Sequence, residues 1–112
     1  MGIFNIFKKK DAAKSQNDRE LIASNAVALS GVVAITEDAE LKNELSALME
    51  KVKYTTALMD DKAYALDKKM SGIIGDLKIE VTKNKGDEKS SAKIENLVRD
   101  LKAAVAERHA LV

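Results

Sequence analysis

The apolar residues between Leu41 and Leu77 recur in alternating steps of four and three, and this spacing constrains the fold more than any other feature. Such a heptad seam is typical of α-helices that pack side by side. The 112-residue chain also has no proline and only five glycines, so little in it would end a helix. We therefore expect an all-α, three- or four-helix antiparallel bundle with coiled-coil-like packing and a short amphipathic N-terminal segment.

The seam changes phase between residues 59 and 63, as a four-residue stutter would produce. Two adjacent β-branched residues, Thr55 and Thr56, precede the change. The stretch 37–83 is therefore either one helix with a local unwinding or two helices, the second capped by Thr55 or Thr56. A continuous helix would be about 70 Å long, nearly the summed length of the other two. We favour a break within 54–60, which gives four helices.

A first helix is expected from about Asp18 to Ile35, with Asn17 as its N-cap. Residues 21–36 carry no charge, so this helix has no polar face. A helix that is apolar all round is normally buried all round, which requires a fourth helix, a second copy of the chain or lipid as a neighbour. Sixteen helical residues span about 24 Å, less than the roughly 30 Å of a bilayer core, so lipid is disfavoured. A homodimer is expected.

The clearest turn is 84–87, where Asn84 or Gly86 can take positive φ and Asp87 can cap the last helix, from about Glu88 to Ala110. Gly72 and Gly75 are expected to mark a close packing contact or a bend. The large apolar residues of the helical stripes are expected to form the core or an oligomer interface. They are Ile22, Leu29, Val33, Leu45, Leu48, Val52, Leu66, Ile73, Leu97 and Leu101.

Composition argues against several functions. The 19 basic and 18 acidic residues give a net charge of +1, which offers no support for nucleic-acid binding. Cysteine is absent, His109 is the single histidine, and no Glu-x-x-His motif occurs, so no metal site is predicted. His109 is interpreted as an ordinary residue of a helix C-terminus. We predict no catalytic residue, cofactor or small-molecule substrate, and therefore no enzyme.

The N-terminal segment, residues 1–16, is expected to be separate from a bundle domain of residues 17–112. Both phenylalanines of the chain lie in its first seven residues. The predicted binding residues are Ile3, Phe4, Ile6 and Phe7, followed by Lys8, Lys9 and Lys10. They could bury against the bundle itself, an anionic membrane surface or a groove of a protein partner. In shape the first ten residues resemble the short amphipathic membrane-targeting starts of bacterial peripheral proteins.

These features predict a non-enzymatic scaffold or adaptor, cytoplasmic or peripheral at the membrane, that docks reversibly through its N-terminal segment on a membrane or protein partner. The alternative is a helical protein that regulates or inhibits a partner protein through a helix face. A weaker alternative is association with nucleic acid through a set of lysines interleaved with acidic residues: Lys51, Lys53, Lys62, Lys68 and Lys69.

Overall fold

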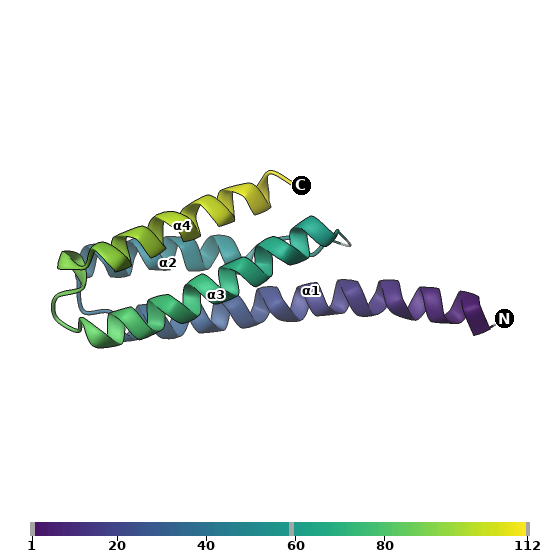
Figure 1. Ribbon diagram of the computed structural model, residues 1–112, viewed down its shortest axis with the longest axis horizontal. Coiled ribbons are helices and arrows are strands. Elements are labelled where there is room, and N and C mark those ends of the chain that lie inside the picture. The colour runs from purple at the N-terminus through teal and green to yellow at the C-terminus, as the bar shows by residue number, and fades with distance from the viewer. Residues whose placement is uncertain (1, 59, 112) are drawn as a thin grey trace.

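The computed structural model describes the backbone of residues 2–58 and 60–111, and the side chains of residues 18–58 and 60–111. Within these limits the fold is all-α, with no strand, which confirms the predicted fold class (Figure 1). The elements are α1 (Gly2–Ile35), α2 (Ala39–Lys53), α3 (Asp61–Lys83), the 3-10 turn η1 (Glu88–Ser90) and α4 (Ala92–His109). The predicted boundary at residues 16 and 17 falls within α1.

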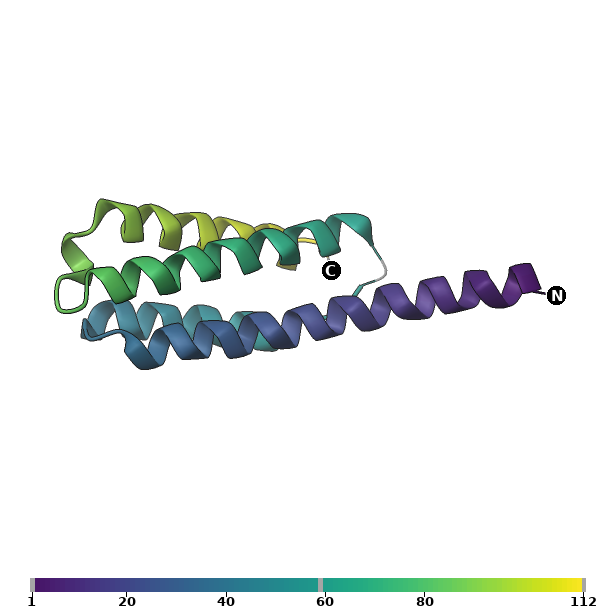
Figure 2. The ribbon, with the colours of Figure 1, turned by 60° about the horizontal axis from the view of Figure 1, so that its bottom comes forward.

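The bundle consists of two antiparallel hairpins packed on one another. Helices α1 and α2 form one hairpin and α3 and α4 form the other, and both turns lie at the same end of the molecule (Figures 1 and 2). Helix α1 packs against α2 and α3, while α4 packs against α3 and less closely against α2. The α2–α3 connection therefore has to pass from one hairpin to the other at the opposite end.

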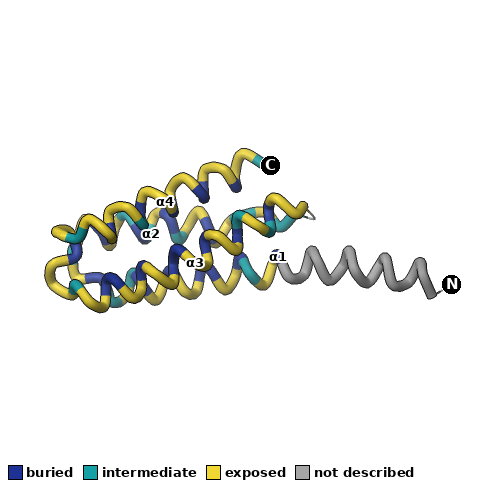
Figure 3. The backbone as a smooth tube through the Cα atoms, viewed as in Figure 1, coloured by how far each residue is buried: buried dark blue, intermediate teal, exposed yellow. Residues whose placement is uncertain are grey.

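The core among the described side chains contains no aromatic group, and Figure 3 marks buried positions along all four helices. Alternation of four- and three-residue steps brings apolar groups of all four helices onto this inner side. The most completely enclosed members are Leu29, Val32, Leu45, Leu77, Val81 and Leu101. Tyr54 is exposed and Tyr64 is half-buried, so neither tyrosine belongs to the core.

The expected break in the second helical stretch is confirmed, but its cap differs from the one predicted. Helix α3 begins after Asp60, whose carboxylate accepts a hydrogen bond of 2.8 Å from the Lys62 amide. The Thr55 hydroxyl instead donates to the carbonyl of Lys51, in the last turn of α2. An aspartate carboxylate accepts from a free amide more strongly than a threonine hydroxyl does, which explains why the helix starts after Asp60.

The turn at 84–87 also differs in detail. Gly86 has φ of 92°, as predicted for this position. Asp87, however, makes no side-chain cap, and α4 starts after Ser91, whose hydroxyl accepts from the Ile94 amide at 3.2 Å. The extra turn η1 buries the Glu88 carboxylate, which accepts from the amides of Glu37 (2.6 Å) and Gly86 (3.1 Å). Glu88 therefore ties the two hairpin turns together, and the backbone donors lower the pKa of its carboxyl group.

The single chain does not provide two of the expected contacts. A Cβ at Gly72 or Gly75 would meet nothing within 4 Å, so neither glycine marks a close contact. Helix α1 is also not buried on every side, because α2 and α3 cover only part of it. Ala23, Val27 and Ala34 remain exposed, and Val27 keeps 73% of its surface accessible.

Candidate functional site

The side chains predicted to bind a membrane or partner lie outside the described residues. They are Ile3, Phe4, Ile6, Phe7, Lys8, Lys9 and Lys10. By sequence they belong to α1, the helix whose later turns pack into the bundle. The choice between the bundle itself, a membrane and a protein groove as their contact surface therefore stays a prediction.

The apolar residues predicted for the core or an oligomer interface lie inside the single chain. Ile22, Leu29, Leu45, Leu48, Val52, Ile73 and Leu101 are buried, and Val33, Leu66 and Leu97 are half-buried. Because these side chains pack mainly within the monomer, a surface for another molecule must draw chiefly on other residues.

Such a surface exists on the outer side of α1. From residue 21 to its end at residue 35 this helix has no charged side chain, and its outward positions include Ala23, Val27, Ser30 and Ala34. Val27 is one of three large apolar residues that the described part of the chain exposes, together with Tyr54 and Ile79. We call Ala23, Val27, Ser30 and Ala34 the α1 face.

A groove of about 710 Å³ runs beside the α1 face, between α1 and α2. Its floor and walls include Ile22, Ala26 and Met49, and it shares Ala23, Val27 and Ser30 with the α1 face. The charged residues lining it are Arg19 and Lys53, both basic. The groove is therefore apolar along its length, with positive charge where α2 ends, and it suits an uncharged helix whose acidic end meets Arg19 and Lys53.

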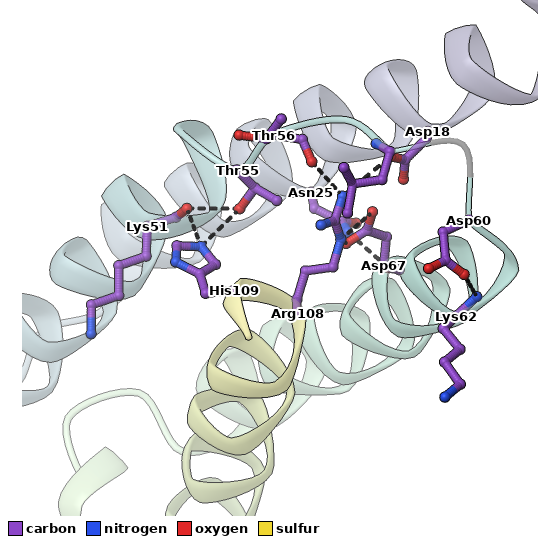
Figure 4. Close-up of polar contacts among 11 residues, drawn as sticks. Asp18, Asn25, Lys51, Thr55, Thr56, Asp60, Lys62, Asp67, Arg108 and His109 are labelled. Carbon is purple, nitrogen blue, oxygen red and sulfur yellow. Dashed lines mark hydrogen bonds and ion pairs between the residues drawn. The ribbon is translucent and has the colours of Figure 1, made fainter. Parts of the chain in front are cut away.

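Sequence analysis missed a cluster of buried charges at the end of the bundle where α4 finishes (Figure 4). The Arg108 side chain is fully buried between Asp18 of α1 and Asp67 of α3, each only 1% exposed. Its Nε lies 3.1 and 3.2 Å from the two Asp67 oxygens, and its Nη2 lies 3.2 Å from Asp18 Oδ2. The same Nη2 donates to the carbonyl of Thr56 at 2.7 Å.

Further hydrogen bonds attach the α2–α3 connection and α1 to this cluster. The amide of Leu58 donates to Asp18 Oδ2 at 2.8 Å, and the Asn25 side chain donates to the carbonyl of Asp67 at 2.8 Å. Two buried atoms in the described structure, Asp18 Oδ1 and Arg108 Nη1, have no hydrogen-bond partner. The cluster therefore joins three helices and one connection through a single guanidinium.

The cluster holds two carboxyl groups against one guanidinium, so full ionisation would bury an excess negative charge. Burial and the neighbouring Asp18 raise the pKa of Asp67 to about 7, and this outweighs the opposing effect of Arg108. A protonated Asp67 makes the cluster neutral and can donate to Asp18, whose second oxygen otherwise lacks a partner. Because solvent does not reach these side chains, we assign the cluster a structural role.

The missed cluster does have a signal in the sequence. Asp18 stands four residues before Ile22, Asp67 four after Ala63, and Arg108 three after Val105. Each charge thus occupies a seam position that would otherwise hold an apolar residue. Polar residues at such positions specify register in coiled coils, and opposite charges on different helices would indicate a buried pair.

His109, the last residue of α4, contacts the end of α2 (Figure 4). Its Nε2 lies 3.1 Å from the Lys51 carbonyl oxygen and 3.1 Å from the Thr55 hydroxyl. An Nε2–H tautomer donates to that carbonyl, which is one of the last acceptors of α2 and lacks a helical partner. Its described contacts are those of a helix end.

Across the described residues, no group of three or more His, Cys, Asp or Glu side chains is placed to hold a metal ion. In the same part of the chain, no helix combines the length and apolarity needed to cross a bilayer. Comparison of the chain with known protein families, with curated proteins and with solved structures finds no match.

Proposed function

We propose that the protein is a non-enzymatic docking scaffold that binds an anionic membrane surface reversibly through residues 1–16 and acts as a homodimer. The described bundle is the rigid body that the segment carries to the membrane. The position of the aromatic residues is the observation that supports this proposal most strongly. Both phenylalanines precede residue 8, whereas the core among the described side chains contains no aromatic group.

The order of residues in the segment favours lipid as the surface. Phe4 and Phe7 are followed at once by Lys8, Lys9 and Lys10. Aromatic and aliphatic groups beside lysines form the pattern of helices that lie in a membrane interface. Anionic lipids are concentrated in the cytoplasmic leaflet, so we place the protein in the cytoplasm, attached peripherally to the membrane.

The energies involved favour a weak and reversible attachment. Burial of a large apolar side chain contributes about 1.5–3 kcal/mol, and each lysine near an anionic surface adds about 1 kcal/mol. Helix α1 already includes residues 2–16, so the opposing cost is chiefly the rotamer freedom of the side chains that become fixed, up to about 2 kcal/mol each. The difference is small for one segment. Two segments in a dimer would bind far more tightly through their effective concentration.

Co-sedimentation with vesicles tests the proposal. The intact chain is mixed with phosphatidylserine-containing vesicles, and the pelleted fraction is compared with that of the Phe4→Ala/Phe7→Ala variant. We expect the variant's partition constant to fall about tenfold or more, since two aromatic groups no longer enter the interface. Vesicles of phosphatidylcholine alone should bind the intact chain more weakly, because the lysines lose their attraction.

A matched control removes two exposed apolar groups from the bundle instead. Tyr54 and Ile79 are 72% and 55% exposed, so Tyr54→Ala/Ile79→Ala should leave pelleting unchanged. Equal pelleting of the intact chain and the Phe4→Ala/Phe7→Ala variant would overturn the proposal. Failure of the intact chain to pellet would also overturn it and would leave the bundle itself or a protein groove as the surface for the segment.

A second candidate function is regulation of a partner protein through a helix face. The exposed α1 face and its adjoining groove favour it, since an uncharged helical surface of this kind suits another helix. The same uncharged face could also bind a second copy of the chain.

A further inference from the structure

We propose that the α1 face binds a second copy of this chain through an antiparallel, two-fold contact between the two α1 helices. Each α1 would lie along the groove between α1 and α2 of the other copy. This inference concerns a described surface of the bundle and does not depend on membrane docking by residues 1–16.

The α1 face is symmetrical in its spacing. Its outward residues stand at positions 23, 27, 30 and 34, so the intervals read four, three and four from either end. In a two-fold contact centred between residues 28 and 29, Ala23 meets Ala34 of the other copy and Val27 meets Ser30. An isologous contact requires such self-complementarity, because the same surface must serve on both sides.

The size of the side chains permits close approach of the two helices. Apart from Val27 the exposed positions of α1 between residues 23 and 34 are alanine, serine and glycine. The two Val27 side chains would then enter the grooves lined by Ile22, Ala26 and Met49. This burial gives the contact an apolar centre with no charge in it.

Charge at the two ends of the face fixes the antiparallel direction. Arg19 and Lys53 line the groove at one end. The acidic turn formed by Glu37 and Asp38 follows α1 at the other end. Antiparallel pairing brings the basic end of each copy beside the acidic turn of its partner, twice in the dimer. Parallel pairing would place like charges together at both ends.

The available area predicts a weak dimer. The uncharged stretch is about 24 Å long, and a helix with its side chains is about 10–12 Å across. The contact therefore buries only a few hundred Å² on each copy, less than the roughly 800 Å² per partner of a standard interface. Association should therefore depend on concentration, with monomer and dimer in exchange.

Sedimentation equilibrium of the full chain over a wide concentration range tests the proposal. We expect a reversible monomer–dimer equilibrium. Val27→Glu should weaken it about tenfold or more, because a charge would enter the apolar centre from each copy. Ile79→Glu is the matched control, since it places the same charge at an exposed apolar residue of α3 and should leave the equilibrium unchanged.

Direct cross-linking tests the geometry without changing the charge of the face. The chain has no cysteine, so single cysteines report specific contacts. An equal mixture of Ala23→Cys and Ala34→Cys chains should form the mixed disulfide on mild oxidation. Each variant alone should cross-link far less, because the antiparallel contact keeps identical positions apart.

Several results would overturn the proposal. They are a monomer at all concentrations, a dimer that Val27→Glu leaves intact, or a dimer that Ile79→Glu disrupts equally. Efficient cross-linking of Ala23→Cys with itself would show that identical positions meet and would also overturn it. The Phe4→Ala/Phe7→Ala chain should keep the equilibrium without lipid, and its loss there would place the contact in residues 1–16 instead.

Discussion

At the scale of single residues, the Arg108 side chain holds together the helices at the end of the bundle where α4 finishes. It connects α4 to Asp67 of α3, Asp18 of α1 and the Thr56 carbonyl of the α2–α3 connection. A buried ion pair contributes little net stability compared with a well-packed apolar alternative, but its partial removal is costly. The carboxyl groups would remain buried without their donor.

Replacement of Arg108 is therefore expected to be among the most damaging single changes. We expect Arg108→Met to lower the free energy of unfolding by about 3–5 kcal/mol, as measured by urea denaturation. Arg99→Met on the same helix is the control, since the Arg99 side chain is exposed and donates to the nearby Asn96 side chain of α4. Similar effects of the two substitutions would contradict a stabilising role for the cluster.

The pKa of Asp67 gives stability a pH dependence of unusual sign. The folded state raises this pKa from 3.8 to about 7, so the folded state binds the proton more tightly than the unfolded state. The contribution is full below pH 3.8 and is lost as the pH rises towards 7. We expect the free energy of unfolding to fall between about pH 5 and 7 by up to about 1.4 kcal/mol per pH unit.

Asp67→Asn is the test of this assignment, because it mimics the protonated carboxyl group. The variant should lose the Asp67 component of the pH dependence and should exceed the natural protein in stability above about pH 7. Measurement above about pH 5 avoids the opposite contribution of Glu88, whose lowered pKa makes its stabilisation disappear only in acid. An unchanged slope in Asp67→Asn would assign the pH dependence to another group.

The charges of this cluster could not be placed from the sequence, although their positions carried a signal. Either Leu66 or Asp67 fits the heptad spacing between Ala63 and Met70, and hydrophobicity alone predicts that Leu66 is the buried residue. The structure buries Asp67 and leaves Leu66 half-buried. The contact with Arg108, which is distant in the sequence, offsets the free-energy cost of burying the Asp67 carboxyl group. A single sequence does not show which residues come into contact across a bundle.

At the scale of the elements, the helices and the break between α2 and α3 were predictable because they follow from local spacing. The seam phase changes there, and β-branched residues precede the change. The caps were less predictable. Asp60 caps α3 in place of Thr55 or Thr56 because its carboxylate is the stronger acceptor. Ser91 caps α4 in place of Asp87 because the turn η1, which buries Glu88, lies between them. The exposed side of α1 was not predictable either, because apolarity alone does not show whether a face is buried within one chain.

The glycines of α3 provide a prediction at this scale. Gly72 and Gly75 lie inside a helix, and the space that a methyl group would occupy at either position is open, so each costs helix stability with no contact in return. We expect Gly72→Ala and Gly75→Ala each to raise the free energy of unfolding by about 1 kcal/mol. Gly86→Ala, at φ of 92°, should lower it by a similar amount. A loss of stability in the α3 variants would indicate that another molecule packs on these glycines.

At the scale of the whole molecule, the structure describes a packed helical bundle. Self-association through the α1 face and docking of the N-terminal segment are proposals, and each has its own test. A dimer through the α1 face would present two N-terminal segments to one membrane. The overall affinity of the dimer for the membrane would then exceed the weak affinity of each segment. Disruption of the dimer should then weaken membrane binding as well, without any change in the segment.

Membrane attachment by residues 1–16 is tested by the vesicle-bound fraction of the intact chain, measured beside its Phe4→Ala/Phe7→Ala variant. The account predicts that phosphatidylserine-containing vesicles retain the natural chain and that replacing Phe4 and Phe7 releases it while the bundle stays folded. Retention of both proteins to the same extent, or of neither, would contradict it.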